Sequence, residues 1–225
     1  MIQIQYRHTT QKYYLGGGGE ESPYYPVGAD CVLYHAYWDG TAVDHSSYGN
    51  DGTVISGTFV ENAIYLNGAV TGGLSFSSIN LGKLAASMFV WINVEYHSYV
   101  NNTVFGGGLN YCFPRYSTGS HSPLIYVMVS NTGPGDMTTP AYDSAWKLMG
   151  ISYDGSKADH YTNGEFYSTK NGTFAADLVL TRIGVTEADS NRYYGLIGEI
   201  LLFNSVKSEA DHLAFFNATK ARYGY

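Results

Sequence analysis

Apolar and polar residues alternate along several short segments of the chain, and this alternation is typical of β-strands. In "CVLYHAYWDG", every second residue from Val32 to Trp38 falls on one face of an extended backbone. In "FVWINV", which begins at Phe89, both faces are largely apolar, so this segment is predicted to be a central strand covered on both sides. The segment that begins at Trp146 repeats the pattern. The chain is therefore predicted to be rich in β-structure, with Trp91 and Trp146 buried.

Turn-forming residues separate the predicted strands. Asp and Asn side chains cap neighbouring backbone amides and Gly accepts a positive φ, so clusters of these residues favour ordered turns. One such turn is predicted in "DHSSYGNDGTV", at Asp44, Asn50, Asp51 and Gly52. A second turn, at Asp154 and Gly155, closes the strand that follows Trp146. The pair Asn163 and Gly164 is the strongest short signal for a two-residue β-hairpin.

The C-terminal segment changes from strand to helix periodicity. An apolar run at 200–203 predicts a buried strand, and Ser208 and Asp211 then resemble a capping box in which Asp replaces the usual Glu. Gly224 is placed to end the helix. The residues expected at helical spacing on its buried face are Leu213, Phe216 and Tyr223.

The composition is that of one globular domain. An all-β domain commonly has this length of 225 residues, and 44% apolar with 14% charged residues is an ordinary balance. The 22 Tyr and 27 Gly residues suit pleated strands and tight turns, and a surplus of Tyr also suits a binding surface. The net charge of -7, with only 12 Lys and Arg residues, argues against a nucleic-acid partner.

The residues that could bind a metal or form a disulfide are sparse. Cys31 and Cys112 are too few for a disulfide framework or a metal cluster, and they form either one bridge across the fold or two buried free thiols. The histidines lack metal-binding spacing. Oxygens of Asp44, Asn50 and Asp51 can hold a structural calcium ion, but a turn closed by its own side chains is the favoured alternative. No cofactor is therefore expected.

Residues 1–28 differ from the rest of the chain and are predicted to form an N-terminal arm or linker. Ile2, Ile4 and Tyr6 alternate with polar residues, and a run of glycines follows. The first residues lack the apolar core of a secretory signal, and no stretch of about 20 apolar residues predicts membrane insertion. This pattern favours a virion or another extracellular surface as the location.

The ordered series of motifs over residues 30–225 resembles the laminin-G-like (LamG) branch of the concanavalin A-like jelly rolls. The motifs are "DHSSYGNDGTV" from Asp44, "AIYLNG" from Ala63, "MFVWINV" from Met88, "WKLMGISYDGSKADHYTNGEFY" from Trp146, "TRIGV" from Thr181 and "GLIGEILLFNSVKSEAD" from Gly195. The resemblance implies an all-β jelly-roll sandwich of two antiparallel sheets with a short C-terminal helix, over residues 29–225. Because this family includes lectins, adhesins, enzyme appendages and virion components, the resemblance does not select one function.

The sequence does not predict catalysis. Glycoside hydrolysis needs two carboxylates across a cleft, and jelly-roll glucanases carry them at alternate positions of one strand. Here the acidic residue in a confidently predicted strand is Glu199, and its neighbour at a period of two, Leu201, is apolar. No acidic partner for Glu199 is evident, so the chain is predicted not to be an enzyme.

A binding surface is the functional prediction. Polar and aromatic residues are concentrated between the predicted core strands, in segments expected to be loops, and could bind a ligand: Tyr96, His97, Tyr99, Asn110, Tyr111, Arg115 and Tyr116. Aromatic faces stack on sugar rings while Asn and Arg bond their hydroxyls, so this mixture suits a glycan. The same mixture suits a protein interface.

Two non-enzymatic functions therefore remain open. The first is a surface or decoration subunit of a virion or other large assembly, whose N-terminal arm contacts neighbouring protein subunits. The alternative is a carbohydrate-binding lectin or adhesin module that recognises cell-surface or polysaccharide glycans.

Overall fold

The computed structural model describes residues 24–68, 73–95, 103–107, 110–116, 123–129, 132–138, 145–185 and 192–225. Within 110–116, 123–129 and 132–138 it describes the backbone, together with the side chain of Met137. Among the described helices, none is long and apolar enough to span a lipid bilayer.

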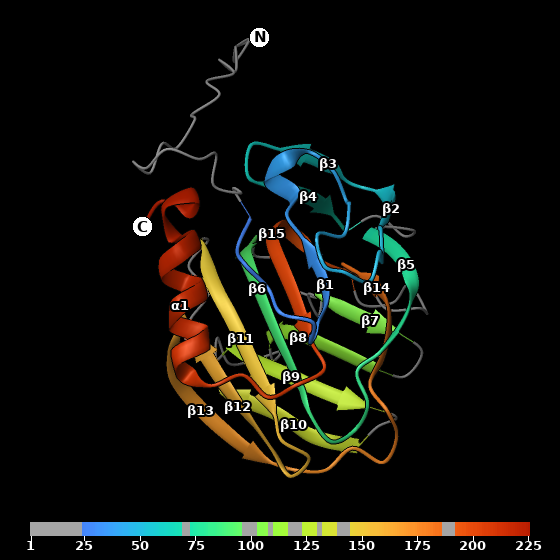
Figure 1. The fold of residues 1–225 in the computed structure, drawn as a ribbon, viewed down its shortest axis with the longest axis vertical. Coiled ribbons are helices and arrows are strands. Elements are labelled where there is room, and N and C mark those ends of the chain that lie inside the picture. Colours follow the sequence, from blue (N-terminus) through green and yellow to red (C-terminus); the bar gives the residue numbers. More distant parts are fainter. Residues whose placement is uncertain are drawn as a thin grey trace, which may run out of the picture.

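The described chain forms two antiparallel sheets, which confirms the predicted all-β sandwich (Figure 1). One is eight-stranded, in the order β13-β12-β11-β6-β15-β4-β3 with β1 also paired to β15; the other is seven-stranded, in the order β10-β9-β8-β7-β14-β5-β2. The first contains β1 (Cys31–His35), β3 (Thr58–Val60), β4 (Ala63–Asn67), β6 (Ala86–Val94), β11 (Lys147–Tyr153), β12 (Lys157–Thr162), β13 (Glu165–Asn171) and β15 (Tyr194–Phe203). The second contains β2 (Thr53–Ser56), β5 (Gly73–Asn80), β7 (Phe105–Gly107), β8 (Asn110–Tyr116), β9 (Pro123–Val129), β10 (Thr132–Thr138) and β14 (Val179–Ile183).

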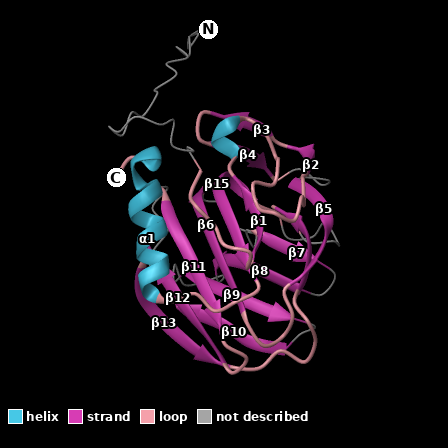
Figure 2. Cartoon of the chain, viewed as in Figure 1, coloured by secondary structure: helices cyan, strands magenta, loops and turns pink. Residues whose placement is uncertain are grey.

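Helical structure is minor in the described chain (Figure 2). It comprises a 3-10 turn η1 (Tyr37–Asp39), the helix α1 (Glu209–Thr219) and a second 3-10 turn η2 (Lys220–Tyr223) that continues α1. Figure 1 shows α1 beside β11, while β8, β9 and β10 cross behind the eight-stranded sheet. The short C-terminal helix is therefore where the sequence predicts it.

Strand β6 is central, as its two apolar faces predict. It pairs with β11 on one side and with β15 on the other. Val90 and Ile92 belong to the core between the sheets, whereas Phe89 and Trp91 belong to a second apolar cluster on the opposite face of the strand. Trp91 is fully buried, as expected, but Trp146 is only partly buried, because it precedes β11 and packs at the edge of that cluster.

The second apolar cluster lies between the eight-stranded sheet and α1. Phe215 of α1 and Tyr223 of η2 are buried against it. Residues from the end of the predicted arm also cover it, since the Tyr25 ring meets the Phe215 ring edge-on at 5.1 Å between centroids. Residues 24–28 of the predicted arm thus contact the body of the domain, and residues 1–23 lie outside the described part of the chain.

The start of α1 is as predicted, and of the three residues expected on its buried face Tyr223 is buried and Phe216 partly buried, but Leu213 is not. Ser208 accepts from the Asp211 N–H and the Asp211 carboxylate accepts from the Ser208 N–H, which completes the capping box. The buried residues of the helix are His212, Phe215 and Thr219, while Leu213 is 41% exposed. His212 occupies the buried position instead, because its ring stacks on Tyr161 and fills the space above Gly150. That space exists only because residue 150 is a glycine, since a Cβ added there would lie 2.3 Å from His212 Nδ1.

The predicted turns are confirmed. Asn163 and Gly164 join β12 to β13. Their φ angles of 54° and 85° are both positive, as a two-residue hairpin turn of type I′ requires. Asp154 Oδ1 accepts from the N–H groups of Ser156 and Lys157 at 2.9 Å each, and Gly155 has φ of 91°. Local side-chain and backbone preferences therefore specify these connections.

Cys31 is a free, buried thiol, so of the two alternatives for this residue the unbridged one holds. Its Sγ donates to the Leu33 carbonyl oxygen at 3.3 Å, and burial raises the pKa of the thiol to about 12. Cys112 lies in the other sheet, where it pairs with Phe105. A thiol this hard to ionise is a packing residue and not a nucleophile.

Candidate functional site

The outer face of the seven-stranded sheet presents a polar row. On β5, Leu74 and Phe76 belong to the core between the sheets, so Ser75 between them points outward. Arg182 on β14 pairs directly with Ser75, and directly paired residues of antiparallel strands carry their side chains on the same face. The next residue, Ile183, is buried in the core, whereas Arg182 is partly exposed. Arg182 therefore lies on the outer face, in the middle of the sheet.

The row extends across five neighbouring strands. In register order from β2 to β8 it consists of Thr53, Ser75, Arg182, Gly106 and Tyr111. Neighbouring strands are about 4.8 Å apart, so the row is about 19 Å long. Gly106, which follows Arg182 in the row, is buried. An extended row with hydroxyl and guanidinium groups suits a chain-like polar ligand.

The seven strands of this sheet carry little charge, and that charge is positive overall. Their charged residues are Arg115, Asp136 and Arg182. Strands β2, β5, β7 and β14 contain no acidic residue. Within the described part of the chain, the Arg182 side chain has neither an ion pair nor a hydrogen bond. In a protein of net charge -7, Arg182 is therefore a positive group that no described side chain neutralises.

The seven ligand residues predicted from the sequence fall into two groups. Asn110, Tyr111, Arg115 and Tyr116 form strand β8 and not a loop, which corrects the expectation. The strand includes Pro114, a residue type that is uncommon within a sheet. Tyr96, His97 and Tyr99 lie outside the described residues.

The structure brings one of these seven, Tyr111, into the row with Arg182 and Ser75, through the pairing of Tyr111 with Gly106. The residues that sequence reasoning missed are Thr53, Ser75 and Arg182. The available signal was a charged residue in the otherwise uncharged strand β14, "VLTRI". Its neighbours in the row come from strands far apart in the sequence, so only the register joins them.

A second cluster holds Tyr24 and Tyr25, the first described residues, against the domain. The Tyr24 ring stacks on His45 at 3.8 Å between centroids, and its hydroxyl donates to Asp39 Oδ2 at 3.2 Å. His45 Nε2 lies 2.9 Å from the same oxygen. The Tyr25 N–H donates to the Tyr34 hydroxyl at 3.0 Å. Burial and the nearby Asp39 raise the pKa of Tyr24, which keeps its hydroxyl protonated as the donor to Asp39.

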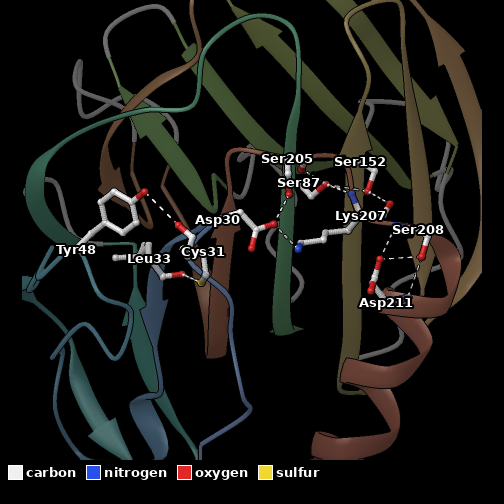
Figure 3. Close-up of polar contacts among 11 residues, drawn as sticks. Asp30, Cys31, Leu33, Tyr48, Ser87, Ser152, Ser205, Lys207, Ser208 and Asp211 are labelled. Carbon is white, nitrogen blue, oxygen red and sulfur yellow. Dashed lines mark hydrogen bonds and ion pairs between the residues drawn. The ribbon is translucent and has the colours of Figure 1, made fainter.

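Buried serines and a histidine form a polar network under α1, and Figure 3 shows the contacts among its serines and Lys207. Ser152 Oγ lies 3.0 Å from Ser87 Oγ and 2.9 Å from His212 Nε2. Ser87 Oγ also donates to the Ser205 carbonyl at 2.9 Å and accepts from the Lys207 N–H at 2.8 Å. The network therefore ties the connection between β15 and α1 to the central strands.

A serine beside a histidine is also the arrangement of an activated nucleophile. Here Ser152 is only 4% exposed, and Ser87 and His212 are fully buried, so a substrate cannot reach the hydroxyls. Burial lowers the pKa of His212 to about 3, and its Nδ1 has no hydrogen-bond partner among the described residues to orient the ring as a base. These groups therefore have a structural role: they hold the connection between β15 and α1 against the central strands.

Glu199 is buried and paired with a cation. Arg222 Nη1 donates to Glu199 Oε1, and the Glu199 N–H donates to the Tyr223 hydroxyl at 2.8 Å. Burial raises the pKa of Glu199 to about 7, although Arg222 and the Trp38 indole N–H act to lower it. The partner of Glu199 is thus an arginine, and a catalytic carboxylate pair is not formed at this residue.

The Asp44 carboxylate closes its own turn. Its Oδ1 accepts from the N–H groups of Tyr34 and Ser46 at 2.8 and 2.9 Å, and its Oδ2 accepts from the Asn50 N–H at 2.7 Å. The Asp44 N–H donates to Asp51 Oδ1 at 2.8 Å. Within the described ranges, no three His, Cys, Asp or Glu side chains are grouped to hold a metal ion. The contacts at Asp44 are those of the favoured side-chain-closed turn.

No family model matches the chain, and no curated protein matches its sequence. Its fold is similar to that of domain 4 of AbnA, a GH43 extracellular arabinanase from Geobacillus stearothermophilus, in complex with arabinotriose; the TM-score is 0.64 at 15% identity, over 83% of this chain and 98% of that domain. It is also similar to the binding domain of Paraclostridial Mosquitocidal Protein 1, with a TM-score of 0.61 at 12% identity over 84% of this chain and 52% of that one.

A third similar structure is the botulinum neurotoxin serotype G binding domain, with a TM-score of 0.59 at 14% identity, over 85% of this chain and 51% of that one. The chain spans about half the length of the toxin binding domains that it matches. At these identities the likenesses show the fold alone.

Proposed function

We propose that the chain is a non-enzymatic binding module that recognises a glycan on the outer face of its seven-stranded sheet. The observation that carries the proposal is the row of Thr53, Ser75, Arg182, Gly106 and Tyr111 across five strands. Serine, threonine and arginine side chains bond sugar hydroxyls, and tyrosine offers an aromatic face for a sugar ring. A row on consecutive strands holds these groups at fixed spacing, which limits the entropy lost on binding.

The compared structures and the internal chemistry support a binding role. The AbnA domain, 98% of which matches this chain, was solved with arabinotriose. The toxin matches are binding domains. The two arrangements that resemble catalytic groups, at Ser152 and Glu199, are buried and engaged in structural contacts. The proposed glycan site, on the outer face of the seven-stranded sheet, involves neither Ser152 nor Glu199.

The test is glycan binding by the wild-type chain and by a variant with a blocked row. Ser75 points outward, so Ser75→Tyr places a ring on the row without entering the core. We expect the wild-type chain to bind at least one glycan class on a broad array and Ser75→Tyr to lose that binding. Val60→Tyr, at an exposed position of β3 in the other sheet, is the matched control and should bind normally. Equal glycan binding by Ser75→Tyr would contradict this site.

The anchoring of residue 24 favours a second function, a surface or decoration subunit of a virion or other large assembly. Tyr24 and Tyr25 are held on the body by Asp39, His45, Tyr34 and Phe215. If residues 1–23 bind a neighbouring subunit, the anchored residues 24 and 25 would hold the domain in a fixed position relative to that subunit. A mobile linker at this point would not. This anchoring supports the use of residues 1–23 as a contact with neighbouring protein subunits.

Removal of residues 1–23 separates the two functions, because it leaves Tyr24 and Tyr25 in place. If the chain is an assembly subunit, sedimentation velocity should show loss of self-association or of co-assembly with its partner proteins, with the melting temperature unchanged. Unchanged glycan binding by the same truncated chain is the result expected for the glycan-binding module. Unchanged assembly after the truncation would contradict the role of the arm.

A further inference from the structure

We propose that the glycan carries a carboxylate and that Arg182 binds this group. The inference rests on the glycan-binding function proposed above and names the class of ligand: a saccharide with uronic-acid or sialic-acid residues.

The described environment of Arg182 contains no group that neutralises its charge. It lies between Ser75 on β5 and Gly106 on β7, near the middle of the polar row. Its side chain is partly buried, yet among the described residues it has no carboxylate partner. Partial burial of a guanidinium without a counter-charge costs free energy, and a bound anion would supply that counter-charge.

A carboxylate matches the guanidinium in both charge and shape. The planar fork of arginine donates two parallel hydrogen bonds to one carboxylate, and such charge-assisted pairs are about twice as strong as neutral hydrogen bonds. Gly106, which pairs with Arg182 on the β7 side, is itself buried, so we place the ligand on the Ser75 side of the guanidinium. Ser75 and Thr53, on that side, can bond the hydroxyls of the same or the next sugar.

The surrounding charge also favours an acidic ligand. The chain as a whole carries a net charge of -7 and would repel an acidic saccharide. The four strands β2, β5, β7 and β14 contain Arg182 and no Asp or Glu. On these four described strands, an acidic saccharide at Arg182 would face no carboxylate.

The experiment compares matched acidic and neutral saccharides by isothermal titration calorimetry at low salt. The pairs are trigalacturonic acid with its carboxyl-reduced trisaccharide, and sialyllactose with lactose, supplemented by matched pairs from an array. We expect the acidic member of at least one pair to bind about 10- to 100-fold more tightly, as one charge-assisted bidentate contact predicts.

The variants identify Arg182 as the source of that preference. Arg182→Gln should remove the difference between the acidic and neutral members, and Arg182→Lys should keep part of it, since lysine retains the charge without the fork. Lys83→Gln removes the same charge from an exposed turn between β5 and β6 and should keep the full preference. Circular dichroism and melting curves verify that all three variants are folded.

The possible outcomes separate the two proposals. If the wild-type chain binds neutral and acidic members equally and Ser75→Tyr abolishes both, glycan binding stands and the carboxylate inference is overturned. If Arg182→Gln keeps the preference, the inference is also overturned. Equal preference for a sulfated polymer would assign the effect to charge alone and reject the carboxylate. If the wild-type chain binds no saccharide on the array, the proposed function itself fails.

Discussion

The Trp91 indole Nε1 donates a hydrogen bond to the Thr219 hydroxyl at 2.8 Å, and both side chains are almost completely buried. Thr219 Oγ1 in turn donates to the Phe215 carbonyl at 2.8 Å within α1. The contact joins the central strand of the eight-stranded sheet to the last turn of the helix, 128 residues away. It fixes the position of α1 along the sheet.

The first prediction concerns this contact. Thr219→Val keeps the side-chain shape but leaves the buried indole N–H without an acceptor, so we expect a loss of about 1 to 3 kcal/mol in the free energy of unfolding. Trp91→Ala should cost about 3 to 5 kcal/mol through lost burial and a cavity, and Trp146→Ala should cost less because Trp146 is only partly buried. Urea unfolding measures all three.

Asn217→Ala, on the exposed side of the same helix, is the control and should change stability little. A Thr219→Val variant as stable as the wild type would mean that the indole N–H finds another acceptor. Equal losses for Trp91→Ala and Trp146→Ala would contradict the difference in their burial.

The second prediction concerns the pH dependence of stability. Burial raises the pKa of Glu199 to about 7 from an ordinary value of 4.5, so ionisation of this carboxyl is less favourable in the folded chain than in the unfolded chain. Its contribution to stability is therefore fully present below pH 4.5 and decreases as pH rises towards 7, by up to about 1.4 kcal/mol per pH unit. Glu199→Gln should remove this decrease.

His212 acts in the opposite direction over part of the same range. Burial lowers the pKa of His212 to about 3 from 6.5, so the unfolded chain takes up a proton that the folded chain does not, and stability decreases as pH falls below 6.5. In the wild type the two effects oppose each other between pH 4.5 and 6.5. Unfolding free energies at half-unit steps from pH 4.5 to 8 should therefore rise more steeply with pH in Glu199→Gln than in the wild type. Parallel curves for the two proteins would contradict the shifted pKa of Glu199.

Local signals account for the parts of the fold that the sequence predicts correctly. Asn163 with Gly164, and Ser208 with Asp211, act through their own backbones, so the hairpin and the helix start follow from a few adjacent residues. The central position of β6 likewise follows from its two apolar faces.

The errors depend on contacts that are distant in sequence. Helical periodicity favours Leu213 as a buried residue, but the space above Gly150 accepts His212 instead. Arg182 joins the polar row through its pairings with Ser75, more than 100 residues earlier in the chain, and with Gly106. Sequence patterns carry little information on such a register, because each strand shows only its own alternation.

The third prediction concerns the space between Gly150 and His212. An added Cβ at Gly150 would lie 2.3 Å from His212 Nδ1 and 2.6 Å from His212 Cε1, so Gly150→Ala should cost about 1 to 3 kcal/mol through overpacking. The double variant Gly150→Ala with His212→Ala removes the ring that the methyl group meets. The cost of adding the methyl group should then become smaller than in the wild type. A double-mutant cycle by urea unfolding measures the coupling, and simple additivity would contradict a direct collision.

The last prediction concerns calcium at the turn of Asp44. Both carboxylate oxygens of Asp44 already accept backbone N–H groups, from Tyr34, Ser46 and Asn50, so a cation would have to compete with these contacts. We therefore expect the melting temperature to be the same in EDTA and in millimolar calcium. Asp44→Ala should lower stability by about 1 to 3 kcal/mol in both conditions, because it leaves partly buried N–H groups unpaired. A melting temperature that rises with calcium in the wild type but not in Asp44→Ala would instead show that the carboxylate binds the ion, since only a ligand of the folded state stabilises in this way.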